Sequence, residues 1–164
     1  MLEKKAESAF REPGQIATIL GIMGIVLWYA DTRGKKSRTL QQMSLAQALL
    51  IGVAQGIAVI PGISRAGITI TAALAQGFDR KDAARFSFLM SMPIIFGACV
   101  LKLRHLTGAD LTPIFWSGVL AAAVSGYLAI GGLIKYLQTR SYGVFAVYRI
   151  VVAIAVWALI LVRH

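Results

Sequence analysis

Long apolar stretches separated by short polar loops dominate the chain. Four of them are long enough to cross a bilayer and predict membrane-spanning helices over residues 15–30, 86–101, 114–134 and 143–162. At 1.5 Å per residue each is ~24 Å or longer, close to the ~30 Å thickness of the hydrocarbon layer. Pro93 and Gly97 predict a kink in the second helix.

A fifth apolar region, residues 45–78, has a different pattern. Two arms, Leu45–Ile60 and Ile68–Phe78, flank a polar break over 61–67. The second arm makes only ~16 Å of helix, about half the hydrocarbon thickness. Short arms around a Pro/Gly turn are typical of a re-entrant helix-loop-helix, whose irregular backbone must face protein or a wet cavity. We therefore predict a re-entrant hairpin with its tip at a cavity.

Composition supports a membrane protein. The chain has 164 residues, of which 57% are hydrophobic and 15% are charged, whereas ordinary soluble domains have about 25% charged residues. The sequence predicts an all-α polytopic membrane protein with about four transmembrane helices and one re-entrant hairpin. A single membrane domain over 15–164 is expected to follow a polar segment over 1–14. That segment lacks the apolar core and cleavage site of a secretory signal peptide.

The net charge of +10 is best explained by membrane topology. Nine Lys and Arg residues fall in loops 31–44, 79–85 and 135–142, and six fall in the termini and loop 102–113. Positive residues favour the cytoplasmic side, so this layout places both termini outside. No basic face with interleaved aromatic residues is present, and nucleic acid is not an expected partner.

Arg65 is the residue most indicative of function, because a guanidinium within a membrane is costly and usually faces an anionic partner. All seven Asp and Glu residues fall in predicted loops or termini, so the partner is expected to be a ligand. The planar fork of Arg suits phosphate. The alternative is that Arg65 extends to the interface or caps the carbonyls of a packing turn.

The neighbours of Arg65 fit an anion cradle. Ser64 and Thr69 supply hydroxyls, while Gly62 and Gly67 allow a positive φ and a close approach of the backbone to an oxyanion. The helix that follows would present its N-terminus to the anion. Arg149, in the last span, is a second cation within the apolar segments. Extension to the interface or bonding to carbonyls is its default interpretation, and contact with a lipid phosphate is the alternative.

Two segments together resemble a known family. Residues 61–69, PGISRAGIT, resemble the PG-x-SRSG-x-T motif of the undecaprenyl-diphosphate phosphatases, bacterial enzymes linked to bacitracin resistance, and Gln55 begins the matched run. FSFL at 86–89, followed by Met92-Pro93 and Gly97-Ala98, resembles a second family segment. The resemblance extends from about Gln15 to the end of the chain. Ala66 departs from the Ser of the motif, which removes one hydroxyl.

The resemblance implies hydrolysis of undecaprenyl diphosphate to the monophosphate, which recycles the lipid carrier for the cell wall in the bacterial inner membrane. Ser64, Arg65 and Thr69 match positions that the family uses around the diphosphate, with Gly62, Gly67 and Gln55 expected to contact the substrate. A divalent cation, Mg²⁺ or Ca²⁺, is also implied. Neither the resemblance nor the residues identify a metal ligand in this chain.

The family is roughly two such repeats long, which makes this chain resemble the C-terminal half of an inverted-repeat fold. The E-x-x-x-E segment and the PISSSGH-type loop of the first half, assigned to metal binding and catalysis, have no counterpart here. We expect no turnover from the chain alone. The expected partners are a polyprenyl diphosphate lipid and either a missing N-terminal half or further copies in a homo-oligomer.

Two other classes of function stay open at the level of sequence. Re-entrant loops also build anion transporters and lipid flippases, which need an anion cradle but no nucleophile. A pseudoenzyme or assembly module is the third possibility. The SR-x5-H element of type 2 phosphatidic-acid phosphatases is disfavoured, because Thr71 stands at the position of its His.

Overall fold

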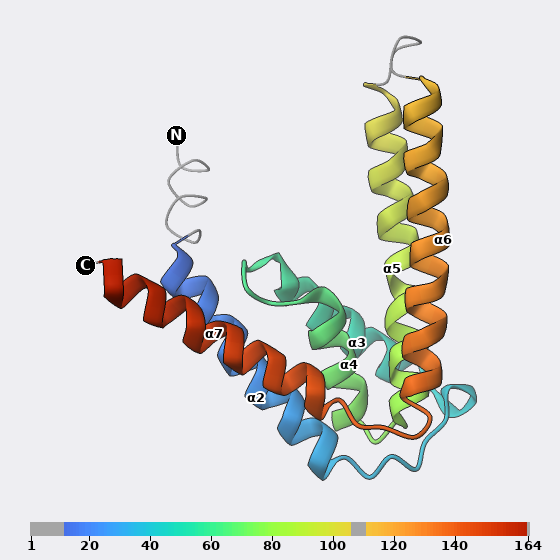
Figure 1. The fold of residues 1–164 in the computed structure, drawn as a ribbon. Coiled ribbons are helices and arrows are strands. Elements are labelled where there is room, and N and C mark those ends of the chain that lie inside the picture. The colour runs from blue at the N-terminus through green and yellow to red at the C-terminus, as the bar shows by residue number, and fades with distance from the viewer. Residues whose placement is uncertain (1–11, 106–110, 164) are drawn as a thin grey trace.

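The computed structural model describes residues 12–105 and 111–163, and every element of regular structure in those ranges is a helix. Figure 1 shows two long helix pairs with a shorter helical hairpin between them. The prediction of an all-α fold is confirmed. The elements are α2 (Pro13–Arg33), η1 (Leu40–Gln42), α3 (Leu45–Gly56), η2 (Ile57–Val59), α4 (Arg65–Ala75), α5 (Arg80–Leu103), α6 (Pro113–Tyr136) and α7 (Gly143–Arg163).

The four predicted spans correspond to α2, α5, α6 and α7, each long and apolar enough to cross a membrane. Their bounds differ from those predicted at the polar ends. α2 continues to Arg33, and α5 begins at Arg80 instead of residue 86 because the side chain of Asp79 caps it by accepting a hydrogen bond from the Asp82 amide (2.7 Å). Hydropathy does not detect such charged helical turns.

The predicted N-terminal segment 1–14 is only partly described. α2 begins at Pro13, a favoured first position because proline lacks the amide proton that a helix start leaves unpaired. The rest of the segment, residues 1–11, lies outside the described residues. The same holds for residues 106–110 of the predicted loop 102–113. α5 itself stays continuous through Pro93.

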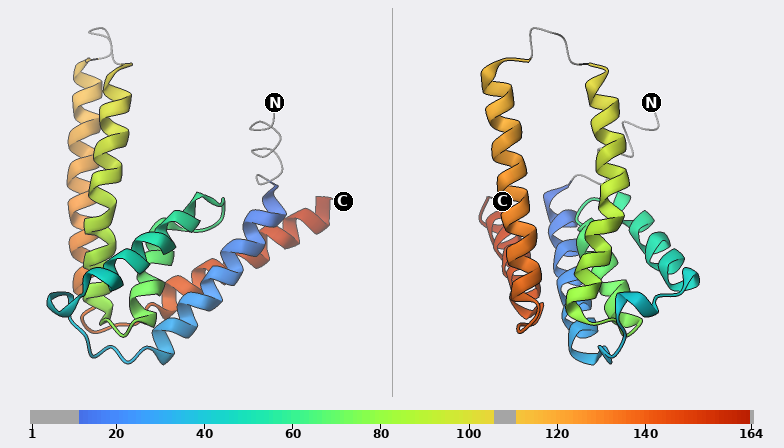
Figure 2. Two further views of the ribbon diagram at one scale, coloured as in Figure 1. Left: turned by 180° about the vertical axis from the view of Figure 1, so that it is seen from behind. Right: turned by 90° about the vertical axis from the view of Figure 1, so that its right-hand side faces the viewer.

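α2 and α7 pack side by side along most of their length (Figures 1 and 2). Small residues permit the close approach. A Cβ added at Gly24 would lie 3.1 Å from the carbonyl oxygen of Ala146 and from the Cβ of Arg149, and one at Gly21 would lie 3.2 Å from the Cβ of Ala153. Such close contact stabilises helix pairs in membranes. Apolar side chains are surrounded by apolar groups in lipid and in protein alike, so tight packing is what favours the helix pair.

α3 and α4 form the hairpin predicted over 45–78, and neither is long enough to cross a bilayer, at ~18 and ~16 Å. α4 begins at Arg65, so the polar break 61–67 is shorter than predicted and its last three residues are helical. α4 contacts α2, α3 and α5 and is the central helix of the fold. Insertion of this hairpin into a bilayer remains a prediction.

The loops that carry most positive charge meet at one end of the molecule. The Arg38 amide donates to the carbonyl of Gly77 (3.0 Å), and the Asp79 amide donates to the carbonyl of Arg38 (2.9 Å). Leu40 donates its amide to the carboxylate of Asp82 (2.7 Å). The feet of the α3–α4 hairpin, which are the start of α3 and the end of α4, therefore lie at the same end of the molecule. The assignment of these loops to one side of the membrane required this arrangement.

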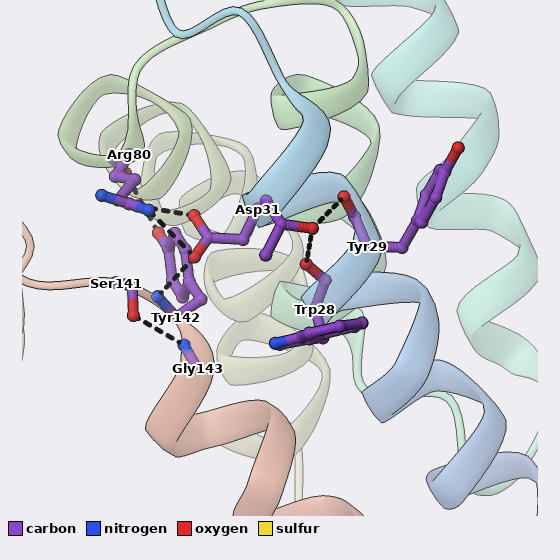
Figure 3. A network of polar contacts seen from close by, with 8 residues as sticks. Trp28, Tyr29, Asp31, Arg80, Ser141, Tyr142 and Gly143 are labelled. Atoms are coloured by element: carbon purple, nitrogen blue, oxygen red, sulfur yellow. Dashed lines mark hydrogen bonds and ion pairs between the residues drawn. The ribbon is translucent and has the colours of Figure 1, made fainter.

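A buried carboxylate joins three helices at this polar end (Figure 3). Asp31, 1% exposed, accepts hydrogen bonds from Arg80 Nε (2.6 Å) and Nη2 (3.2 Å) and from the backbone amide of Tyr142 (3.1 Å). The Tyr142 hydroxyl donates to the Arg80 carbonyl (3.0 Å). Asp31 was predicted to lie in a loop, and that was wrong. It occupies the last turn of α2, where its partners replace water.

The α5–α6 pair extends away from the rest of the molecule (Figures 1 and 2). α6 has no buried residue among those described, and the outer half of α5 is equally exposed. Large apolar side chains of the pair are 58% exposed or more, as in Phe96 on α5 and in Trp116 and Leu120 on α6. The described residues leave the apolar surface of the α5–α6 pair uncovered. Lipid or other protein must therefore cover it.

Asp31→Asn should destabilise the fold by about 3 kcal/mol, because it removes the charge that compensates the Arg80 guanidinium at a buried site. Thermal unfolding in detergent micelles, followed by circular dichroism, measures the change. Glu12→Gln is the matched control, since Glu12 is exposed and its side chain caps nothing. An equal midpoint for both variants would contradict a structural role for the network.

Burial raises the pKa of the Tyr142 hydroxyl above its ordinary value, and the Asp31 carboxylate raises it further while Arg80 opposes the change. The folded protein therefore holds this proton more tightly than the unfolded chain. The protonated Tyr142 hydroxyl makes its whole contribution to the free energy of unfolding below pH ~10, and this contribution is lost as the pH rises further. Unfolding midpoints of wild type and Tyr142→Phe between pH 8 and 11 should show a shallower decline for the variant. Parallel curves would contradict this.

Candidate anion site at the first turn of α4

The turn at the tip of the hairpin follows from the Pro61-Gly62 pair. The Ile63 amide donates to the carbonyl of Ile60 (3.2 Å), and Gly62 has a φ of +94°. A proline followed by a residue with positive φ is the pattern of a type II turn. A Cβ at Gly62 would lie 2.9 Å from the carbonyl oxygen of Ile16. The predicted positive φ is confirmed, and the close approach that Gly62 makes is to α2.

Ser64 begins α4. Its Oγ accepts a hydrogen bond from the Gly67 amide (3.2 Å) and so satisfies one of the donors that a helix N-terminus leaves unpaired. Among the described residues, the hydroxyl proton of Ser64 has no acceptor and is available to donate. Arg65, the next residue, is exposed, and the first turn of α4 contains no acidic residue. This turn therefore presents a hydroxyl donor, a guanidinium and the positive end of a helix dipole.

Thr69 lies one turn further along α4 and is buried, with 1% exposure. Its hydroxyl is 2.6 Å from that of Ser87 on α5 and 3.0 Å from the carbonyl of Arg65. The side chain joins α4 to the FSFL segment, and in this arrangement its hydroxyl is already partnered. The predicted donation from Thr69 to a phosphate oxygen would need this pair to rearrange.

Gly67 differs from the prediction. It is helical and does not have a positive φ. A Cβ there would lie 2.5 Å from Nη2 and 2.8 Å from Cζ of Arg149, so only glycine leaves room for this guanidinium. α7 thus brings a second cation to the first turn of α4. The sequence identified Arg149 as an intramembrane cation but could not show where it packs.

Gln55, on the last turn of α3, also belongs to the predicted site. Its Oε1 atom is buried and has no hydrogen-bond partner among the described residues. Burial of an unpaired polar atom is costly and is relieved by water or a ligand. The structure records no hydrogen bond between Gln55 and the first turn of α4.

The described residues do not suit the divalent cation that the family resemblance implied. They contain no group of three or more His, Cys, Asp or Glu side chains able to hold a metal ion. The carboxylates of the polar end, Asp31, Asp79 and Asp82, are engaged with helix caps and arginines. No chemical step can therefore be assigned to a metal held by these residues.

The sequence-predicted residues thus divide into two groups. Ser64, Arg65 and Gly67 share the first turn of α4, where an anion could meet the guanidinium and the helix N-terminus. Gly62 shapes the preceding turn, and Thr69 joins α4 to α5. The structure adds Arg149 and Ser87 to the residues that lie against α4. Only the FSFL resemblance pointed to Ser87, and no spacing pattern linked either residue to α4.

Comparison with known proteins reveals extensive similarity. The sequence model of a family described as bacitracin resistance protein BacA matches residues 1–155. Curated relatives named undecaprenyl-diphosphatase include proteins from Moorella thermoacetica, 48% identical over 164 residues, and from Pelotomaculum thermopropionicum, 44% identical over 164 residues. Each match covers the whole chain but only 63% and 62% of the relative. The chain therefore spans less than two thirds of the length of these proteins.

Gly67→Ala should not lower the thermal midpoint of the unliganded protein, because the added methyl group displaces only the flexible end of Arg149 from the first turn of α4. The control is Gly52→Ala on α3, where an added Cβ meets nothing within 4 Å. Alanine is the better helix former by about 1 kcal/mol, so Gly52→Ala should be neutral or stabilising. Thermal midpoints of both variants in detergent provide the measurement. A midpoint lowered in Gly67→Ala but not in Gly52→Ala would contradict this expectation, because it would show that the folded chain depends on the guanidinium at this place.

Proposed function

Because the chain belongs to the bacitracin resistance protein BacA family, we propose that it carries the diphosphate-binding part of an undecaprenyl-diphosphate phosphatase. In the reaction, a water oxygen bonds to the terminal phosphorus and the bridging P–O bond breaks. The products are inorganic phosphate and undecaprenyl phosphate. Removal of this terminal phosphate would recycle the lipid carrier for cell-wall synthesis.

The observation that carries the proposal is the positive charge at the start of α4, which no acidic residue in the described part of the chain neutralises. Arg65 is exposed there, next to a serine cap and in a turn without an acidic residue. A diphosphate supplies the charge that this turn lacks. The helix N-terminus, the Ser64 hydroxyl and the Arg65 guanidinium are all groups that bind phosphate oxygens.

Arg65 and Ser64 would act mainly on the transition state. Negative charge spreads over the phosphoryl oxygens during transfer, and a fixed cation and hydroxyl donor stabilise it without reorganisation. The water-activating group is not among the residues assigned here. A divalent cation, if bound by the complete enzyme, would offset further diphosphate charge.

The proposed location is the bacterial inner membrane, with α2, α5, α6 and α7 as spans and the α3–α4 hairpin re-entrant. Three features support this arrangement. The four long helices have the length and hydropathy of spans. The hairpin helices are too short to cross, and both hairpin feet lie at the polar end. The excess of Lys and Arg in the loops at that end favours the cytoplasmic side.

A chimera tests the proposed function. The part of the Moorella thermoacetica relative that this chain does not match is fused to the chain, and phosphate release from farnesyl diphosphate is measured with Mg²⁺ or Ca²⁺. The chimera should release phosphate, and Arg65→Ala should lower the rate about 100-fold or more. The chain alone should release none, since it lacks an assigned nucleophile.

Arg140→Ala is the matched control, because Arg140 is exposed in the loop before α7. It should leave the rate unchanged. Equal rates for the Arg65→Ala chimera and its parent would refute the role of the α4 turn. Movement of labelled lipid across liposomes without phosphate release would instead favour a flippase.

A further inference from the structure

Arg149 is a cation at an unfavourable place, and it has no counter-ion among the residues that the structure describes. It lies on α7 six residues after Gly143, ~9 Å inside a helix that is apolar enough to span a membrane. Its Nη1 atom is buried and has no hydrogen-bond partner among the described residues. The carboxylates that form ion pairs in the described chain, Asp31 and Asp82, pair with Arg80 and Arg85 at the polar end.

The surroundings of the guanidinium increase its electrostatic cost. It occupies the space that a Cβ at Gly67, in the first turn of α4, would take. Unpaired amides give a helix N-terminus a partial positive charge, so a cation there is repelled. Arg65 adds a second full positive charge to the same turn, which contains no acidic residue. Without an anion, the arrangement of these three positive groups is unfavourable.

The close packing also shows that the site is built to hold this side chain. The Cβ of Arg149 is 3.1 Å from the Cβ position of Gly24, and its Cζ is 2.8 Å from that of Gly67. Glycines on two different helices thus leave space for the stem and the head of one arginine. The glycine at position 67 is the one that the guanidinium itself requires, and a guanidinium that extended to the membrane interface would not need it.

We infer that Arg149 is a second binding residue for the diphosphate, which it contacts from α7 while Arg65 contacts it from α4. This inference rests on the proposed function and adds a residue that determines specificity. Two guanidiniums suit a diphosphate better than the monophosphate product, because the diphosphate offers more charge and more oxygens for bidentate contact. Arg149 would therefore favour substrate over product.

The test measures binding, not turnover. Farnesyl diphosphate and farnesyl monophosphate are titrated into the purified chain in detergent by calorimetry. Arg149→Gln should weaken binding of the diphosphate about tenfold or more, as expected when a charged hydrogen-bonding partner is lost. Binding of the monophosphate should weaken less. Arg149→Lys, which keeps the charge but not the fork, should be intermediate, and Arg140→Gln should bind both ligands as wild type does.

A readout without ligand separates binding from a structural role. If Arg149 serves to hold an anion, Arg149→Gln removes a repelled charge and should not lower the thermal midpoint of the unliganded chain. A lower midpoint together with an equal loss of affinity for both ligands would overturn the inference. Diphosphate affinity unchanged in Arg149→Gln would overturn it as well.

The proposed function can fail separately. If the wild-type chain binds diphosphate and Arg65→Gln weakens that binding while Arg149→Gln does not, the inference alone is wrong. If wild type binds no diphosphate, or if Arg65→Gln has no effect, the α4 turn is not a diphosphate site. In that case the proposed function falls, and the inference falls with it.

Discussion

The buried carboxylate of Asp31 is the interaction on which the arrangement of the helices depends. A carboxylate removed from water must be paired and hydrogen-bonded, or it would be protonated or exposed. Arg80 and the Tyr142 amide provide those partners from the start of α5 and the residue before α7. The positions of α5 and α7 are thereby fixed relative to α2 at the polar end. Farther along α7, the Arg149 guanidinium reaches Gly67 from this fixed start.

α4 connects this constraint to the candidate anion site. It is surrounded by α2, α3 and α5, and most of its residues from Gly67 to Leu74 are buried. Its first turn is nevertheless partly accessible and positively charged. The backbone of that turn belongs to the central helix of a packed core and has little freedom to move, which suits electrostatic stabilisation that depends on fixed position. Thr69 and Ser87 contribute to this rigidity through their buried hydroxyl pair.

Sequence patterns predicted the parts of the fold that depend on local chemistry. Apolar runs located the four long helices, and the Pro61-Gly62 pair predicted the turn at the hairpin tip. The same patterns failed where polar residues are helical, as at Asp31 and in the charged first turns of α5. Hydropathy assigns such residues to loops because it cannot detect partners that lie 49 or 111 positions away. The positive φ expected at Gly67 was wrong for a related reason, since the glycine serves a contact with α7.

The sequence alone determined that this is a helical membrane protein of a recognisable family, and that Ser64 and Arg65 follow a Pro/Gly turn. Those conclusions depend on composition, on periodicity and on short motifs, all of which are local. The tertiary structure decided which distant side chain lies against the first turn of α4. Arg65 and Arg149 are 84 positions apart, and only the packing of α7 against α2 and α4 brings the second to the turn that carries the first. Charges without an acidic partner become informative when their three-dimensional neighbours are known, because electrostatic energy depends on distance in space.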